Sequence, residues 1–244
     1  AAGHVTAFGE AEAEAEADAD AEGELRAADA VKGLALYRWL SAASTLRPIT
    51  PHGAIPAYLR GRHLLAGTLR GADRLRAPPL VFVDEARARL VGFYSLGHAL
   101  AGHRDTVHGG LLAAIVDESL AFTAIPQLPG RSVALTSKLS LRYVSPTPTG
   151  SVIVVATETV AFAGDYDRKV TVRAAVLDAK AVPPESFADP NYDINTGAAE
   201  ESFEAYTKRI IKTHGRSTVR CVAEAEFVVP RSLAGWLYAW DQAS

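Results

Sequence analysis

The stretch that decides the fold runs from residue 106 to residue 124 and reads TVHGGLLAAIVDESLAFTA. From Leu111 onward it is rich in Leu, Ala and Ile, which favour a helix, and Pro126 follows soon after Ala124 to end it. Its apolar residues cover nearly the whole circumference instead of forming one stripe. The pattern therefore predicts a helix over residues 111–124 that is buried in the core.

Two carboxylates, Asp117 and Glu118, lie in the middle of this apolar helix. A buried carboxylate must be paired, protonated or used in chemistry, because burial removes its hydration. At the helix start, Gly109 and Gly110 leave backbone N–H groups uncovered, so an oxyanion can approach them. These are the parts of an acyl-transfer site, although glycines here are also compatible with tight packing alone, and His108 with simple capping of the helix.

The spacing of these features suggests two chains. Gly110 and Asp117 are seven residues apart, so they share a helix face but lie roughly 10 Å apart along the axis. One carbonyl cannot contact both. Two antiparallel copies of the helix about a two-fold axis would place Gly110 of one chain beside Asp117 of the other, which predicts a homodimer with interfacial sites.

Composition excludes several other classes of protein. The 244 residues are 48% hydrophobic, which is enough for a full core. The sequence contains no run of 18 apolar residues, so it predicts no membrane-spanning helix. The single cysteine, Cys221, excludes an internal disulfide and a cysteine-rich zinc site. No basic, aromatic-interleaved patch for nucleic acid and no phosphate-binding loop is present. The sequence also lacks Met, and a removed targeting peptide would leave such a start.

The chain divides into four predicted parts. Residues 1–24 form an acidic leader, in which eight acids alternate with Ala and Gly and favour a solvated, disordered tail. Residues 25–79 hold a helix, to about residue 46, and a lead-in rich in Pro, Gly and Arg. Residues 80–231 form the main domain, with an insertion at 179–216 before the last strand, and residues 232–244 form an aromatic tail.

Strand patterns surround the central helix. They cover residues 80–83, 90–96, 133–144, 151–162, 169–177 and 217–229, and a helical pattern covers 200–212 within the insertion. In 133–144, apolar and polar residues alternate, and this alternation assigns Thr136 to the polar face. The order of elements predicts an α+β fold in which an antiparallel sheet curls around one helix.

The histidines are not predicted to bind a metal. We interpret His52 and His63 as ordinary surface or loop residues, because no second ligand is spaced to complete a site with them. His98, His103 and His108 are five residues apart, which fits neither a helix face nor a strand face, and no Cys or acidic pair completes a shell.

The motif Val107-His108-Gly109-Gly110, with Asp117 nine residues after the His and ALTSKLSLRY at 134–143, resembles a known family. It is similar to the HGG-type (PaaI-like) hotdog-fold acyl-CoA thioesterases, in particular the mitochondrial thioesterase-superfamily branch and its fungal relatives. The resemblance covers residues 64–178 and resumes at 217–230. It implies a hotdog fold, homodimers or dimers of dimers, and a mitochondrial location, with a cytoplasmic one as the alternative.

The resemblance also implies roles for single residues. Asp117 would activate water or attack the thioester, Gly110 and Gly109 would hold the oxyanion, His108 would orient the loop or polarise the carbonyl, and Thr136 would position the water. Substrate binding would involve Arg168 and Lys169, through the phosphates of coenzyme A, and Glu118, which is also an alternative base. Coenzyme A enters as part of the substrate, and no separate cofactor is implied.

Two functions therefore stand. The first is hydrolysis of fatty or related acyl-CoA thioesters. The second is a thioesterase-like structural subunit of a larger, mitochondrial complex with reduced or no activity, because residues 179–216 and the tail offer docking surfaces. The tail residues that suggest docking are Leu233, Trp236, Leu237 and Trp240.

Overall fold

The computed structural model describes residues 21–43, 45–86, 88–128, 134–163, 168–184 and 201–230. Residues 21–32 are helical. The remaining elements, in chain order, are α2 (Ala35–Ala42), β1 (Arg47–Ile49), η1 (Pro51–Ala54), α3 (Ala57–Arg60), η2 (Leu64–Thr68), β2 (Leu80–Asp84), β3 (Arg89–Ser95), η3 (His98–Leu100), β4 (Ala101–His103), β5 (Thr106–Val107), α4 (Gly109–Ala124), η4 (Ile125–Gln127), β6 (Leu135–Tyr143), β7 (Val152–Ala163), β8 (Lys169–Asp178), α5 (Phe203–His214) and β9 (Val219–Val228).

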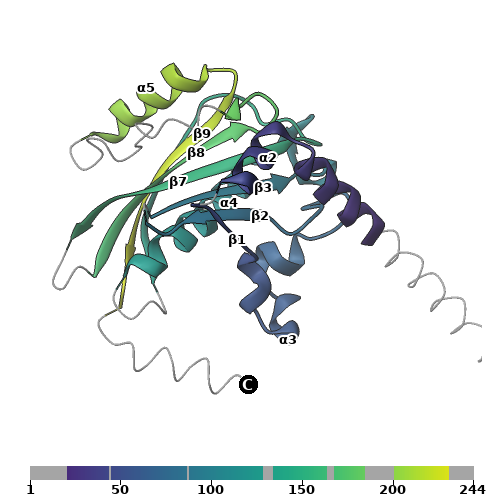
Figure 1. Ribbon diagram of the computed structural model, residues 1–244, viewed down its shortest axis with the longest axis horizontal. Coiled ribbons are helices and arrows are strands. Elements are labelled where there is room, and N and C mark those ends of the chain that lie inside the picture. The colour runs from purple at the N-terminus through teal and green to yellow at the C-terminus, as the bar shows by residue number, and fades with distance from the viewer. Residues whose placement is uncertain are drawn as a thin grey trace, which may run out of the picture.

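An antiparallel sheet curls around helix α4 (Figure 1). Within the described residues it has seven strands in the order β1-β2-β3-β7-β8-β9-β6, and β4 pairs with β5 in a small separate ribbon. The concave face of the sheet packs on α4 through a core that includes Ile115, Val116 and Leu120, none of which is exposed. This arrangement confirms the predicted α+β fold with one central helix.

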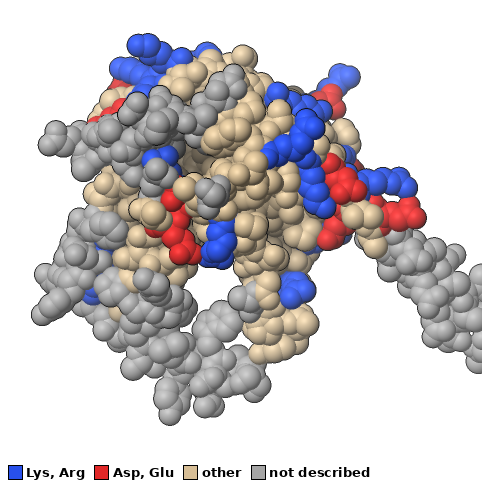
Figure 2. Space-filling model, in the orientation of Figure 1, with Lys and Arg blue, Asp and Glu red and all other residues tan. Residues whose placement is uncertain are grey.

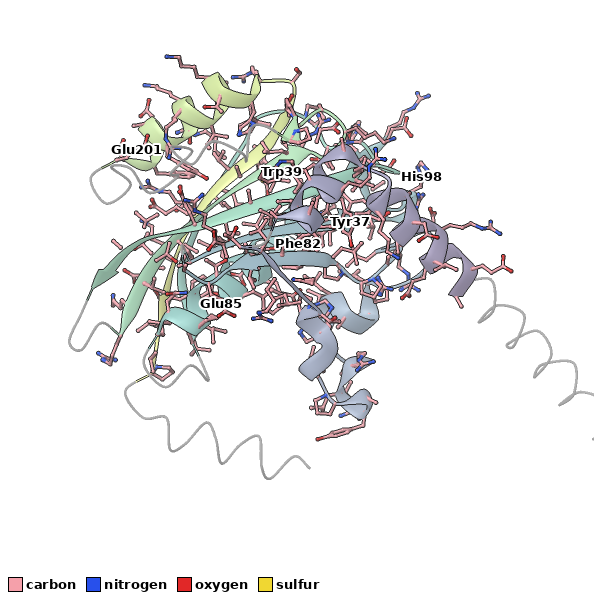
Figure 3. The ribbon with its side chains drawn as sticks, viewed as in Figure 1. Tyr37, Trp39, Phe82, Glu85, His98 and Glu201 are labelled. Carbon is pink, nitrogen blue, oxygen red and sulfur yellow. The ribbon has the colours of Figure 1, made fainter. Side chains whose placement is uncertain are left out.

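The convex face of the sheet carries a second core beneath α2 and α5. Tyr37 of α2 packs edge-on against Phe82 and Phe93, with ring centroids 5.3 Å and 5.7 Å away (Figure 3). Tyr206 and Ile210 of α5 are buried in the same cluster. The outer side of α5 is charged, and the space-filling view shows Lys and Arg side chains gathered over it (Figure 2).

A row of alternating charges crosses four strand boundaries on this convex face. The strand registers pair Asp84 with Arg89, Arg89 with Glu158, Glu158 with Arg173, and Arg173 with Glu224. Opposite charges on directly paired residues stabilise adjacent strands. Three of the five residues are buried: Asp84, Glu158 and Arg173.

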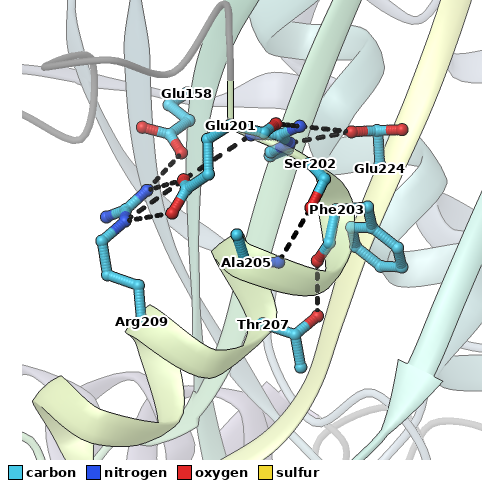
Figure 4. Close-up of polar contacts among 9 residues, drawn as sticks. Glu158, Glu201, Ser202, Phe203, Ala205, Thr207, Arg209 and Glu224 are labelled. Atoms are coloured by element: carbon cyan, nitrogen blue, oxygen red, sulfur yellow. Dashed lines mark hydrogen bonds and ion pairs between the residues drawn. The ribbon is translucent and has the colours of Figure 1, made fainter.

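Helix α5 closes over the middle of this row (Figure 4). Arg209 of α5 bonds to Glu201 at 2.9 Å and lies 3.7 Å from the Glu158 carboxylate. Burial raises the pKa of Glu158 to about 8, although the nearby guanidinium groups of Arg209, Arg173 and Arg89 oppose this rise. The docked helix therefore shields a carboxyl group that holds its proton near neutral pH.

Several boundaries differ from the sequence prediction. The first helical pattern breaks near Gly33, whose N–H bonds to the carbonyl of Asp29, and α2 then starts at Ala35. The segment without a clear pattern contains β1, η1, α3 and η2. The aromatic tail, most of the acidic leader and residues 185–200 of the insertion lie outside the described residues.

One helical stretch, Gly109–Gln127, is long and apolar enough to cross a membrane by length and composition. It is the helix that the sheet encloses, and the apolar circumference of such a core helix meets the same criterion.

Candidate active site

The centre of the candidate site is a contact between helix α4 and strand β6. The Thr136 hydroxyl donates a hydrogen bond of 2.9 Å to Oδ1 of Asp117. This placement corrects the expectation that Thr136 lies on the polar face away from the core. The strand register shifts between Thr136 and Lys138, and such a bulge adds one residue, so Thr136 shares the helix side with Leu139 and Leu141.

Asp117 is half-buried in the middle of α4. Burial raises its pKa, the hydrogen bond from Thr136 lowers it, and the negative charge of Glu118 raises it further. A carboxylate with a raised pKa is a stronger base once it is ionised, which suits proton abstraction from water.

The start of α4 is built closely around His108. Its Nδ1 atom accepts a hydrogen bond of 2.9 Å from the Gly110 N–H, so His108 is the N-cap residue of the helix. A Cβ atom on Gly102 would lie 2.7 Å from His108, and one on Gly110 would lie 3.0 Å from the imidazole. These glycines let the ring approach the helix end closely, and an incoming oxyanion would compete with the imidazole for the Gly110 N–H.

Strand β6 also holds this end of the helix. The Tyr143 hydroxyl donates a hydrogen bond of 2.7 Å to the Gly109 carbonyl, and a Cβ atom on Gly109 would lie 3.2 Å from the Tyr143 ring. Thr136 and Tyr143 therefore tie one strand to both the middle and the start of α4.

A cavity of about 310 Å³ adjoins the start of α4. Leu64, Leu69, Leu100 and Leu111 line it, together with His108 and Gly110. An apolar lining with a few polar groups is typical of small-molecule sites.

Helix α4 carries a strip of small residues that runs from the helix start, at Gly110, past Asp117. Gly110, Ala114, Asp117 and Ala121 recur at helical spacing and are exposed or half-buried in the single chain. Side chains this small allow another helix to approach closely.

The predicted coenzyme A ligands do not converge on Asp117 within one chain. Lys169 forms an ion pair of 3.0 Å with Glu226, while its neighbour Val170 packs in the concave core, so Lys169 lies on the opposite face of the sheet. Arg168 donates to the Val229 carbonyl at 2.9 Å. Both basic residues are thus engaged at strand ends.

Glu118 also points away from Asp117. Its carboxylate lies 2.8 Å from Nε2 of His52 and 3.6 Å from Nε2 of His63. The interpretation of His52 as an ordinary surface or loop residue is therefore wrong, because His52 is 7% exposed and bonded to the central helix. His63 does lie in a loop, and its side chain is 36% exposed. No periodic pattern predicts this contact, because residues 47–79 lack one.

No model of a known protein family matches the chain. Comparison with single proteins does find relatives. An uncharacterized mitochondrial protein of Candida albicans is 28% identical over 127 residues, which cover 52% of this chain and 56% of that protein. MIOREX complex component 3 of Saccharomyces cerevisiae is 35% identical over 101 residues, covering 41% and 37%. Acyl-coenzyme A thioesterase THEM4 of Mus musculus is 31% identical over 110 residues, covering 44% and 45%. The chain has the hotdog fold and is similar in sequence to these proteins.

The matched segments cover about half of the length of these relatives, or less. Among solved structures, a thioesterase from Ralstonia eutropha, described as putative and related to phenylacetic acid degradation, covers 73% of this chain and 96% of its own, with 16% identity and a TM-score of 0.45. Other similar solved structures include thioesterase superfamily member 2 of Mus musculus, with 14% identity over 62% of this chain and 88% of its own and a TM-score of 0.38.

Proposed function

We propose that this protein hydrolyses acyl-CoA thioesters at sites between two copies of the chain. The observation that carries the proposal is the Thr136 to Asp117 hydrogen bond on the partly exposed strip of α4. A half-buried carboxylate that a hydroxyl orients is the group that base-catalysed hydrolysis requires.

In the proposed reaction, Asp117 removes a proton from water as the water oxygen attacks the thioester carbonyl. The carbonyl oxygen becomes an oxyanion, which the Gly110 N–H of the partner subunit stabilises at the positive end of its helix. The carbon–sulfur bond then breaks, and the proton held by Asp117 passes to the coenzyme A thiolate. The products are a carboxylic acid and the free thiol, and Asp117 is regenerated.

The homodimer completes this site. Two α4 helices that pack antiparallel along the strip of Gly110, Ala114, Asp117 and Ala121 bring the start of one helix to the middle of the other. The cavity beside His108 and Gly110 then receives the apolar part of the acyl group.

A second function rests on the relatives. The similarity to a protein named as a MIOREX complex component supports a role as a thioesterase-like subunit of a larger assembly. Relatives that are named mitochondrial support the mitochondrial location expected from the sequence for either function.

The deciding experiment measures thiol release from acyl-CoAs of short, medium and long chains by the purified chain and by Asp117→Asn. Loss of a general base costs about 10²- to 10⁴-fold, so the variant should lose at least 100-fold in turnover while it stays folded. Asp29→Asn, at an exposed position of the N-terminal helix, is the matched control and should keep the wild-type rate. Equal rates for Asp117→Asn and wild type would refute the role of Asp117. A folded wild-type dimer without activity would favour the subunit function.

A further inference from the structure

Three side chains with metal-binding chemistry meet outside the proposed hydrolytic site. One ligand atom of each of His52, His63 and Glu118 lies within 4.8 Å of the other two, and the two imidazole rings have centroids 5.4 Å apart. In the part of the chain that the structure describes, this is the one such group of at least three His, Cys, Asp or Glu side chains.

Separate elements deliver the three groups. His52 comes from η1, His63 is the N-cap residue of η2, and Glu118 comes from the middle of α4. The His52 and Glu118 side chains are 8% and 14% exposed, whereas His63 is 36% exposed. The cluster is therefore enclosed on the helix side and open to solvent on the His63 side.

The spacing of the donor atoms suits one ion. Ligands about 2.0–2.1 Å from a tetrahedral zinc ion lie roughly 3.3–3.4 Å from each other. The Glu118 carboxylate meets the two imidazoles through different oxygens: Oε1 lies 2.8 Å from Nε2 of His52 and Oε2 lies 3.6 Å from Nε2 of His63, on either side of this value. Two imidazoles and one carboxylate also form a ligand set that binds zinc with one open position.

We propose that His52, His63 and Glu118 form a binding site for a divalent transition-metal ion of the zinc class. The ion would clamp the segment from η1 to η2 onto α4. It would also offset the charge of Glu118, a carboxylate that lies against the two imidazoles.

Metal binding has a structural consequence at His63. The Ala66 N–H donates a hydrogen bond of 3.1 Å to Nδ1 of His63, so the proton of the neutral ring is on Nε2 and faces Glu118. Coordination through Nε2 moves this proton to Nδ1, where it would oppose the Ala66 N–H. The first turn of η2 must therefore adjust, and with it Leu64, which lines the cavity beside α4.

The test uses the full chain without an affinity tag, freed of metal by a chelator. Zn²⁺ is titrated in competition with a chromogenic chelator, and Co²⁺ absorption reports the coordination geometry. The variants are His63→Ala and Glu118→Gln, and His103→Ala is the control because His103 is exposed on β4, outside the cluster. Thermal unfolding with and without Zn²⁺ shows that each variant is folded and whether the ion stabilises it.

We expect one Zn²⁺ per chain for wild type and His103→Ala, with a higher unfolding temperature in the presence of the ion. His63→Ala and Glu118→Gln should bind more than 100-fold more weakly, since even outer-shell partners are worth about 10- to 100-fold. Absence of stoichiometric binding by wild type would overturn the proposal. Equal binding by all four proteins would do the same, and the cluster would then be a hydrogen-bonded His–Glu–His clamp. Neither outcome depends on thioester hydrolysis.

Discussion

The Thr136 hydroxyl reaches Asp117 across the gap between an edge strand and the central helix, at 2.9 Å. The contact depends on the register shift between Thr136 and Lys138, because a regular strand would turn Thr136 to the other face. An irregularity of the backbone thus orients the carboxylate on which the proposed chemistry depends.

Removal of this hydrogen bond should alter the pH dependence of hydrolysis. The bond stabilises the ionised form of Asp117, so Thr136→Val should raise the pKa of that carboxyl group further. The acidic limb of kcat/KM against pH should then move to higher pH, while Thr136→Ser, which keeps the hydroxyl, should leave it near the wild-type position. A limb that stays in place in Thr136→Val would show that Asp117 is not the titrating base.

The cap at the start of α4 predicts a difference between two His108 variants. His108→Ala removes the acceptor for the Gly110 N–H and should lower the free energy of unfolding by about 1 kcal/mol. His108→Asn supplies another good capping side chain and should stay close to wild type. Urea unfolding measures both, and equal stability of the two variants would argue against capping. A lower turnover of a stable His108→Asn protein would indicate a direct role for the imidazole.

The small-residue strip predicts how the dimer can be broken. Ala121→Arg places a long charged side chain on the half-buried strip of α4, where a second helix is proposed to pack, and should convert the dimer to monomers. Arg and Ala are both good helix formers, so the helix itself should persist. Sedimentation velocity measures the change, with Ala42→Arg on the exposed end of α2 as the control. A dimer that survives Ala121→Arg would move the interface elsewhere.

Glu158 predicts a fall in stability as the pH rises. Its pKa is about 8 in the folded chain against an ordinary value of 4.5, so between these values the folded state keeps a proton that the unfolded chain releases. The free energy of unfolding should therefore decrease across this window, by at most about 1.4 kcal/mol per pH unit from this one group. Glu158→Gln should remove this contribution and flatten the profile.

Urea unfolding at several pH values between 5 and 9 provides the measurement. The matched control is Glu204→Gln on the exposed side of α5, where an ion pair with Lys208 lowers the pKa of the native Glu204. The contribution of Glu204 is lost only as the pH falls through its folded-state pKa, so this variant should keep the wild-type slope above pH 5. An unchanged slope in Glu158→Gln would show that Glu158 is ionised in the folded protein.

The central helix was predictable from local sequence because its signal is local. Leu, Ala and Ile over 111–124 fixed its type, and only its start differs, since the cap at His108 begins the helix at Gly109. The nearness of Thr136 to Asp117 followed from the family resemblance. The alternation in β6 assigned Thr136 to the wrong face, because a bulge leaves no mark in an apolar and polar pattern.

The contacts that sequence reasoning missed join residues far apart in the chain. His52 and His63 lie in short turns without periodicity, and their partner Glu118 is more than fifty residues away. The charged row is equally non-local, since Arg89, Glu158 and Arg173 become neighbours only through the pairing of β3, β7 and β8. Such contacts depend on strand order, which no single segment encodes.

The charged row also bears on how the chain avoids misfolding. A slip of β7 by one residue would turn Glu158 toward the concave face, where it would lie among the apolar side chains around α4. Arg89 and Arg173 would then lose the carboxyl group that lies between them, and a polar group buried among apolar side chains without a partner is destabilising. Strands with many interchangeable Val and Ala residues could otherwise pair in several alignments of similar energy. The row thus makes the native strand alignment lower in energy than alignments shifted by one residue. The cost is a lower stability in alkaline solution, where Glu158 loses its proton.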